Sequence, residues 1–280
     1  MVSPDSEENT NDAERLRERI SALERTLDAT RTQLRSHINR AKSLDIDFNL
    51  AAKIHFTLLP QPIRNDRIEI DVRYIPIEKV GGDYCQVRFC DKDTCYITMC
   101  DVVGHGVQGA LLATRVSSEV RHWILKGQPP RNIVQLLNSF IYDNFAETGM
   151  FLTFIASRID LERRQITWSG AGHPSPLLIR SDGTTVERLP SQNLLIGVQE
   201  ECLADEPEHT LSLNPGDRLV FHTDGLTETT DSTGKQLGID GLATVAMCVE
   251  LFDMADQILD PVAKYGPTTD DRTLIVAEIK

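Results

Sequence analysis

Apolar side chains recur at alternating intervals of four and three residues through the N-terminal part of the chain. This spacing keeps them on one narrow stripe of an α-helix, as in the seam of a coiled coil. Thr30 and His37 weaken the middle of the stripe. A single amphipathic helix lying on its own domain is the alternative, but several heptads without Pro or Gly favour a parallel homodimer. The stripe comprises Leu16, Ile20, Leu23, Leu27, Thr30, Leu34, His37, Ala41, Leu44, Phe48 and Ala51.

Two prolines, Pro60 and Pro62, stop this helix near Leu59 and divide the chain. The sequence thus predicts a disordered leader at 1–11, a dimerising or linker helix at 12–59, and a folded domain at 60–280. The leader is acidic and polar and lacks the apolar segment of a secretory signal.

The net charge of −13 argues against nucleic acids and anionic membranes as partners. Nucleic-acid binding and attachment to anionic membranes both require a basic surface. No apolar stretch approaches the roughly 18 residues that span a bilayer. We therefore expect a cytoplasmic protein that binds neither nucleic acid nor membrane.

After the prolines, short apolar segments separated by turns predict an α+β domain with antiparallel strands. Expected strands are 68–77, 95–103, 151–159, 164–169, 176–179, 185–189, 218–223 and 273–279, and expected helices are 107–126, 131–147 and 239–265.

Four cysteines, at 85, 90, 95 and 100, recur every five residues. In strands, an odd spacing points successive side chains to opposite faces, so they cannot converge on one ion. The pattern also lacks the paired spacing of zinc sites. We expect buried, reduced thiols.

Four aspartates stand at strand ends or in adjoining turns rich in small residues. Any one alone would be an ordinary turn residue. Gathered in one cleft, they would repel one another unless a cation held them. Hard divalent cations take such oxygen ligands, and a pair of ions can activate a water for attack on phosphorus. The four are Asp83, Asp101, Asp224 and Asp270.

Five blocks in order resemble the PPM family of metal-dependent protein phosphatases, in particular its bacterial SpoIIE/RsbU-type branch. The resemblance runs from about Phe56 to Lys280, and Leu58-Leu59-Pro60 also matches the usual start of that domain. The blocks are VGGDYC, CDVVGHGVQGA, SGAGHPSPLL, FHTDGLTE and TDDRTLIV.

This resemblance implies an αββα sandwich, with two antiparallel sheets between helices. It implies that Asp83 and Asp101 bridge or flank two Mn²⁺ or Mg²⁺ ions and that the Val102 carbonyl is a ligand. Asp224 and Asp270 would complete the site, with Asp271 beside it. The implied substrate is a phosphoserine or phosphothreonine in a STAS-type anti-anti-sigma protein, whose dephosphorylation releases partner switching.

The chain departs from the family pattern at Gln86, where relatives often carry an acid; we interpret this as a lost charge next to the ligands. A phosphate-binding arginine is not identifiable. His105 is the candidate general acid, with a hydrogen bond inside its loop as the alternative. His173 is expected to be structural, and His222 could support the ligands.

Two other functions compete. Gly81-Gly82-Asp83 resembles part of a nucleotide-cyclase signature, but Tyr84 and Cys85 stand where Glu-Phe is expected. The second is a non-catalytic scaffold that binds a signalling partner, whose signature would be loss of a ligand carboxylate. In either a phosphatase or a scaffold, an upstream activator could act through the N-terminal helix.

Overall fold

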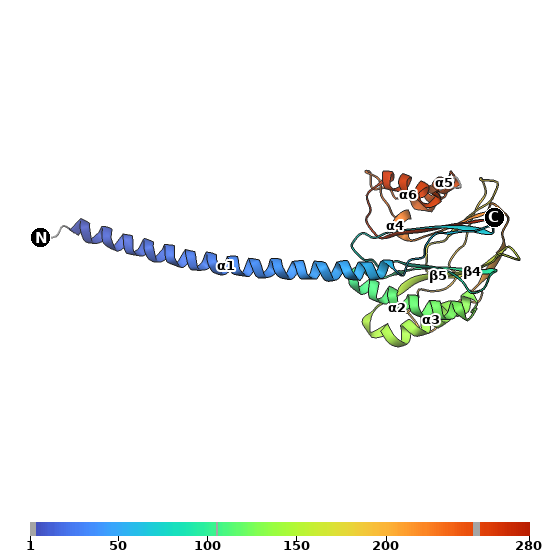
Figure 1. Cartoon of the computed structure of the whole chain (residues 1–280), viewed down its shortest axis with the longest axis horizontal. Coiled ribbons are helices and arrows are strands. Elements are labelled where there is room, and N and C mark those ends of the chain that lie inside the picture. The colour runs from blue at the N-terminus through green and yellow to red at the C-terminus, as the bar shows by residue number, and fades with distance from the viewer. Residues whose placement is uncertain (1–3, 105, 249–252) are drawn as a thin grey trace. The chain divides into compact units, whose positions relative to one another are not determined.

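The computed structural model describes residues 4–104, 106–248 and 253–280 (Figure 1). The chain divides into two compact units, Met1–Leu50 and Ala51–Lys280. The first consists of most of the long helix α1 (Pro4–Phe56), whose residues from Ala51 onward belong to the second unit. Within the described residues, no helix is both long and apolar enough to cross a membrane.

Helix α1 begins earlier than the sequence predicted. Residues 4–11 were expected to be a disordered leader, and they are helical. A proline fits the first helical turn because that amide has no intrahelical partner. Extending an existing helix costs little compared with nucleating one. The helix expected to begin at residue 12 can therefore extend backward through the polar residues 4–11. Along the predicted stripe, large apolar side chains from Leu16 to Phe48 are exposed; whether they form a coiled coil stays a prediction.

The first sheet of the second unit is built around the C-terminal strand. Strand β11 lies between β2 and β10, and every neighbouring pair is antiparallel. The register places Leu274 opposite both Arg73 and His222. In spatial order, the strands are β1 (Ile63–Arg64), β2 (Ile68–Ile75), β11 (Arg272–Ile279), β10 (Arg218–His222), β7 (Leu177–Ile179) and β8 (Val186–Arg188).

The second sheet is also antiparallel and is made mostly of hairpins. Its spatial order is β3 (Tyr84–Phe89), β4 (Thr94–Val102), β5 (Leu152–Asp160), β6 (Gln165–Ala171) and β9 (His209–Ser212). Strands β1, β3 and β9 were not among the expected ones.

Helices cover the outer face of each sheet (Figure 1). On the second sheet lie α2 (Gly106–Leu125) and α3 (Pro130–Phe145), followed by the short 3₁₀ helix at Ala146–Thr148. On the first lie α4 (Asp224–Thr227), α5 (Gly238–Met247) and α6 (Met254–Tyr265). The single helix expected at 239–265 is therefore two helices, and residues 249–252 lie outside the described part.

Three apolar clusters hold these four layers together. One lies between the sheets and includes Ile70, Ile97 and Phe221. The others fill the space between each sheet and its helices. Strand alternation explains this arrangement, because each strand sends successive side chains to opposite faces. The predicted αββα sandwich is confirmed.

The cysteines follow the same alternation. Cys85 and Cys95 lie in the cluster between the sheets, whereas Cys100 lies beneath the helices. All six are free thiols. The prediction of buried thiols is right for these three and for Cys202, but Cys90 is only half-buried and Cys248 is exposed.

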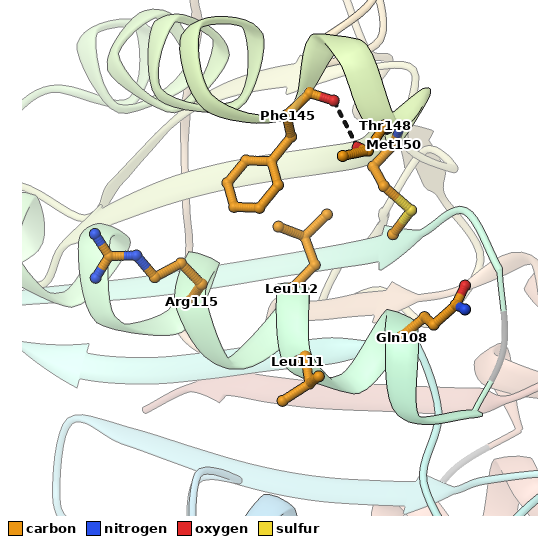
Figure 2. Close-up of a pocket in the computed structure, with 7 residues that line it drawn as sticks. All are labelled: Gln108, Leu111, Leu112, Arg115, Phe145, Thr148 and Met150. Carbon is orange, nitrogen blue, oxygen red and sulfur yellow. Dashed lines mark hydrogen bonds between the residues drawn. The ribbon is translucent and has the colours of Figure 1, made fainter.

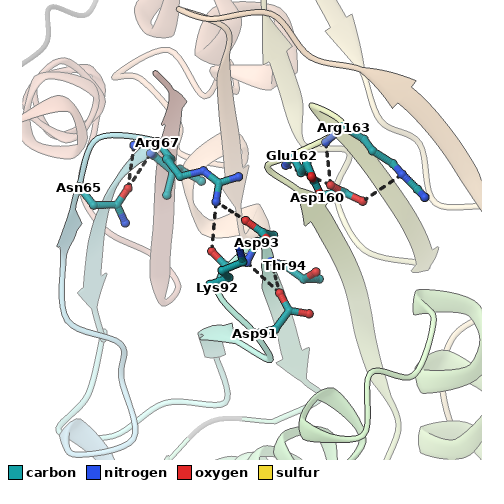
Figure 3. Close-up of polar contacts among 10 residues, drawn as sticks. Asn65, Arg67, Asp91, Lys92, Asp93, Thr94, Asp160, Glu162 and Arg163 are labelled. Carbon is teal, nitrogen blue, oxygen red and sulfur yellow. Dashed lines mark hydrogen bonds and ion pairs between the residues drawn. The ribbon is translucent and has the colours of Figure 1, made fainter.

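Side-chain caps close the hairpin turns at one end of the sandwich (Figure 3). Asp91 and Asp160 each accept hydrogen bonds from two backbone amides that follow them. Arg67 pairs with Asp93 and thereby joins the start of β2 to the β3–β4 turn of the other sheet. These acids already have local partners, which identifies them as turn-forming residues.

Candidate metal and phosphate site

The four predicted aspartates come from both sheets. Asp83 directly precedes β3 and Asp101 lies near the end of β4. Asp224 is the first residue of α4, separated from β10 by Thr223 alone, and Asp270 lies just before β11. Each carboxylate thus stands where a strand begins or ends, as predicted.

Their electrostatic coupling shows that the structure brings them together. The pKa of Asp101 is raised to about 7, first by burial and then by neighbouring negative charges. The pKa of Asp224 is also raised, by burial and then by Asp270 and Glu228. The charges that raise the Asp101 pKa come from Asp224, Asp270, Asp271 and Glu228. Glu228 was not predicted; its place four residues after Asp224 on the same short helical segment was the available signal.

Asp83 is the most deeply buried of the four, with 1% of its surface exposed. Its Oδ2 atom accepts hydrogen bonds from the hydroxyls of Thr223 at 2.7 Å and Thr273 at 2.6 Å. Burial and the Asp101 charge raise the Asp83 pKa well above its ordinary value, while these two bonds oppose the rise. Sequence reasoning missed both threonines, although each lies within three residues of a predicted ligand.

Asp271 fixes the loop that carries Asp83. Its Oδ1 accepts from the amide of Ile77 at 2.8 Å and its Oδ2 from the amide of Gly82 at 3.0 Å. Both carboxylate oxygens are therefore used to hold backbone. This agrees with the supporting place beside the ligands that the sequence resemblance implied for Asp271.

Two glycines allow the segments to approach closely. A Cβ on Gly82 would lie 2.6 Å from the Val102 carbonyl oxygen, the predicted backbone ligand. A Cβ on Gly225 would lie 2.0 Å from the Asp271 carbonyl oxygen. Since both obstacles are backbone atoms, any side chain there would push the carboxylate segments apart.

Arg272 connects the segments that carry Asp224 and Asp270. It is 2% exposed, and its guanidinium donates to the Gly225 carbonyl at 3.3 Å and the Thr229 hydroxyl at 2.8 Å. It also donates to the Pro267 carbonyl at 3.1 Å. Burial lowers its pKa. We infer that its role here is to position α4 and the loop before β11.

The predicted general acid, His105, lies outside the described residues. His173 is 3% exposed, with Nδ1 2.8 Å from the Thr153 hydroxyl and its carbonyl accepting from Ser191 at 2.7 Å. Burial, followed by the nearby His222, lowers its pKa to about 3. A neutral, buried imidazole that ties two loops together agrees with the expected structural role.

His222 is fully buried at the end of β10. Its ring nitrogens lie 3.1 Å from the Thr223 carbonyl and 3.2 Å from the Ser175 carbonyl. Burial lowers its pKa. These partners are backbone oxygens, so His222 supports the strand end from which Thr223 reaches Asp83.

The donor set has the chemistry of a hard-cation site. Neighbouring carboxylates that raise one another's pKa are expected where a divalent cation neutralises them. Among the described side chains, however, no three His, Cys, Asp or Glu residues are grouped tightly enough to hold an ion. The carboxylates therefore share one region without forming a closed cage.

A nearby apolar pocket has different chemistry. It has a volume of about 550 Å³ and lies between α2 and the residues that follow α3 (Figure 2). Its one charged side chain, Arg115, is already paired with Glu119 at 3.0 Å and lies over the Phe140 ring at 5.1 Å. The pocket is thus unsuited to phosphate. It is lined by Gln108, Leu111, Leu112, Arg115, Phe145, Thr148 and Met150.

The family model for stage II sporulation protein E (SpoIIE) matches residues 91–280. The chain belongs to the SpoIIE family. Asp101, Asp224 and Asp270 lie inside the matched range, whereas Asp83 precedes it. The predicted family is confirmed.

Curated relatives of this SpoIIE-family chain include two phosphatases of Bacillus subtilis. It is 25% identical to phosphoserine phosphatase RsbU over 239 residues, covering 84% of this chain and 70% of RsbU. It is 30% identical to phosphoserine phosphatase RsbP over 189 residues, covering 66% of this chain. The match spans 46% of RsbP, less than half its length.

Solved structures show the same fold. The SiaA-PP2C domain of Pseudomonas aeruginosa superposes with a TM-score of 0.72 at 22% identity, covering 86% of this chain and 98% of that one. The PP2C phosphatase domain of SpoIIE from Bacillus subtilis gives 0.66 at 18% identity, covering 78% and 64%. At these identities the likeness concerns the fold alone.

Proposed function

We propose that this chain is a metal-dependent protein phosphatase that hydrolyses phosphoserine or phosphothreonine. The observation that carries the proposal is the gathering of carboxylates around Asp101, whose pKa is raised to about 7, first by burial and then by these neighbouring charges. The names of RsbU and RsbP, both phosphoserine phosphatases, support the same reaction.

Asp83, Asp101, Asp224, Asp270 and the Val102 carbonyl would hold two Mn²⁺ or Mg²⁺ ions. All are oxygen donors, the kind these cations prefer. When bound, the ions would neutralise the phosphate charge and activate the attacking water.

The chain's own residues would prepare this site before substrate arrives. Thr223 and Thr273 orient Asp83, and Asp271 holds the preceding amide of Gly82. These hydrogen bonds fix the orientation of Asp83 and of the loop that carries it, as supporting partners do for metal ligands. Proton donation by His105 to the leaving serine oxygen stays a prediction.

The substrate we propose is a phosphorylated STAS-type anti-anti-sigma protein, acting in a partner-switching pathway in the cytoplasm. Support comes from the sequence resemblance and from the related RsbU and RsbP. An upstream activator would act on α1, and the exposed apolar stripe supports homodimerisation through that helix.

The test is phosphate release from a phosphoserine peptide by the full chain with Mn²⁺, with Mg²⁺ and with EDTA. Asp101→Asn and Asp224→Asn are expected to lower turnover by about a thousandfold or more, because each removes one ligand oxygen charge. Asp182→Asn, in the exposed turn before β8, is the matched control.

Turnover in EDTA, or full activity in both variants, would sink the proposal. If nothing is hydrolysed, Mn²⁺ calorimetry separates two outcomes. Metal binding without turnover indicates an enzyme that needs its activator, whereas no binding favours the non-catalytic scaffold.

A further inference from the structure

Another pocket, which is polar, lies where the chain leaves α1 and enters the phosphatase domain. It has a volume of about 350 Å³, within the range of small-molecule sites. One wall is the segment between α1 and β1, and the other is β3, the edge strand of the second sheet. Its lining includes Thr57, Leu58, Pro60, Gln86, Val87 and Arg88.

Gln86 is an unexplained buried polar group in this pocket. It is 1% exposed, and neither its Oε1 nor its Nε2 has a hydrogen-bond partner among the described residues. Directly opposite on β4, the fully buried Thr98 hydroxyl is likewise unpartnered there. Leaving such groups unpaired is costly, and natural proteins rarely do so. A partner from outside the chain would remove that cost.

Arg88 adds a positive charge on the same face of β3, because residues two apart in a strand point the same way. Its Nε is buried without a partner, and no carboxylate forms an ion pair with it in the described part of the chain. Burial and the charge of Arg121 lower its pKa. Two guanidinium groups thus lie near each other in a protein whose net charge is −13.

We infer that this pocket binds a small oxyanion of the phosphate class. The Arg88 guanidinium would donate to it with the charge-assisted geometry that arginine offers to phosphate, and the Gln86 amide would donate beside it. A cation would be repelled by Arg88 and Arg121, and an apolar ligand would leave the Gln86 amide and the Arg88 guanidinium unpaired.

The presence of Gln86, where relatives often carry an acid, leaves the charge of Arg88 without a carboxylate partner on the same strand face. A carboxylate at this position, as the family resemblance implies, could neutralise Arg88 within the chain. The amide cannot, so the positive charge is available to a ligand. Bound anion would join the segment after α1 to β3, which begins at Tyr84 next to Asp83.

The experiment is calorimetric titration of the full chain with inorganic phosphate in EDTA, at constant ionic strength set with sodium chloride. EDTA leaves the carboxylate cluster negatively charged, so that cluster repels phosphate. We expect one saturable site in the native chain. Arg88→Gln and Gln86→Leu should each weaken phosphate binding at least tenfold.

Arg163→Gln, in the exposed β5–β6 turn, is the matched control and should bind as the native chain does. Leu has nearly the volume of Gln and needs no polar partner, so Gln86→Leu should fold even if Arg88→Gln does not. No binding by the native chain, or native affinity in a folded Gln86→Leu variant, would overturn the inference. The readout requires no catalysis, so its failure is separate from failure of the proposed activity.

Discussion

Asp217 and Asp101 are buried to different degrees, but they differ more in the charged and hydrogen-bonding groups next to each carboxylate. Asp217 is fully buried, and its Oδ2 accepts from Arg180 at 2.8 Å and from the Asn214 amide at 2.8 Å. Its Oδ1 accepts from the Ser181 amide at 2.9 Å. Asp101 faces mainly other carboxylates. One charge is compensated by its own chain, and the other is not.

The difference in partners indicates a structural role for Asp217 and a ligand-binding role for Asp101. A buried charge paired within the chain contributes to a specific fold, whereas removing its partner is strongly destabilising. A cluster of like charges opposes folding and is retained where a ligand compensates it. The same contrast holds for apolar surface. The side chains between the sheets are covered, but the stripe on α1 is exposed.

The largest contrast is expected between Asp217→Asn and Asp101→Asn. Asp217→Asn should lower the free energy of unfolding by about 2–3 kcal/mol, because Arg180 loses one of its two ion pairs and a buried acceptor is lost. In EDTA, Asp101→Asn should leave the melting temperature unchanged or higher, since it removes repulsion. Thermal unfolding of both variants measures this, with activity normalised to folded protein.

For Asp217→Asn the expected drop is roughly 5–10 °C with turnover retained. For Asp101→Asn, turnover should be lost without a drop. A lower melting temperature in Asp101→Asn would break the comparison, because it would show that Asp101 is already compensated within the chain.

An intermediate effect is expected from the threonines that hold Asp83. Thr223→Val and Thr273→Val keep side-chain shape but remove one hydrogen bond each to Asp83. Loss of such supporting bonds typically costs about 10- to 100-fold in metal affinity or activity. Thr223→Val should be worse, because the Thr273 amide also donates to the Thr223 hydroxyl at 3.0 Å.

The Mn²⁺ concentration for half-maximal activity, measured apart from turnover at saturating metal, reports this effect. Thr210→Val, in an exposed hydroxyl pair with Thr167, is the control. Identical metal dependence in all three variants would show that Asp83 does not need its threonines.

The smallest effect on the carboxylate site is expected from α1. Replacing Leu23 and Leu27 together by Asn should dissociate the homodimer that we propose, because both lie on the exposed stripe, and should change turnover only a few-fold. Light scattering coupled to size-exclusion chromatography, with Arg25→Gln as control, measures the oligomeric state. If oligomeric state and activity both stay unchanged, the stripe is not a dimer seam and does not transmit a signal.

Several elements were predictable because their cause is local. Alternating side chains predicted β2, β4 and β11 within one or two residues at most ends, and prolines explained the end of α1. The short edge strands β1 and β9 were missed, because so few residues carry no clear periodicity. The helical start of α1 was missed because polar residues joined a helix that its neighbours had already nucleated.

By itself the sequence determined the α+β class and the four aspartates at strand ends, since these follow from residue spacing and turn chemistry, and its resemblance to a known family implied the αββα layers. It could not distinguish Asp217 from the four aspartates, as Gly216-Asp217 also stands next to a strand. Only the tertiary structure placed Arg180 beside Asp217, the threonines beside Asp83, and the segment after α1 beside Gln86. The physical reason is that a buried charge or amide is defined by its partners, and those partners come from distant parts of the chain.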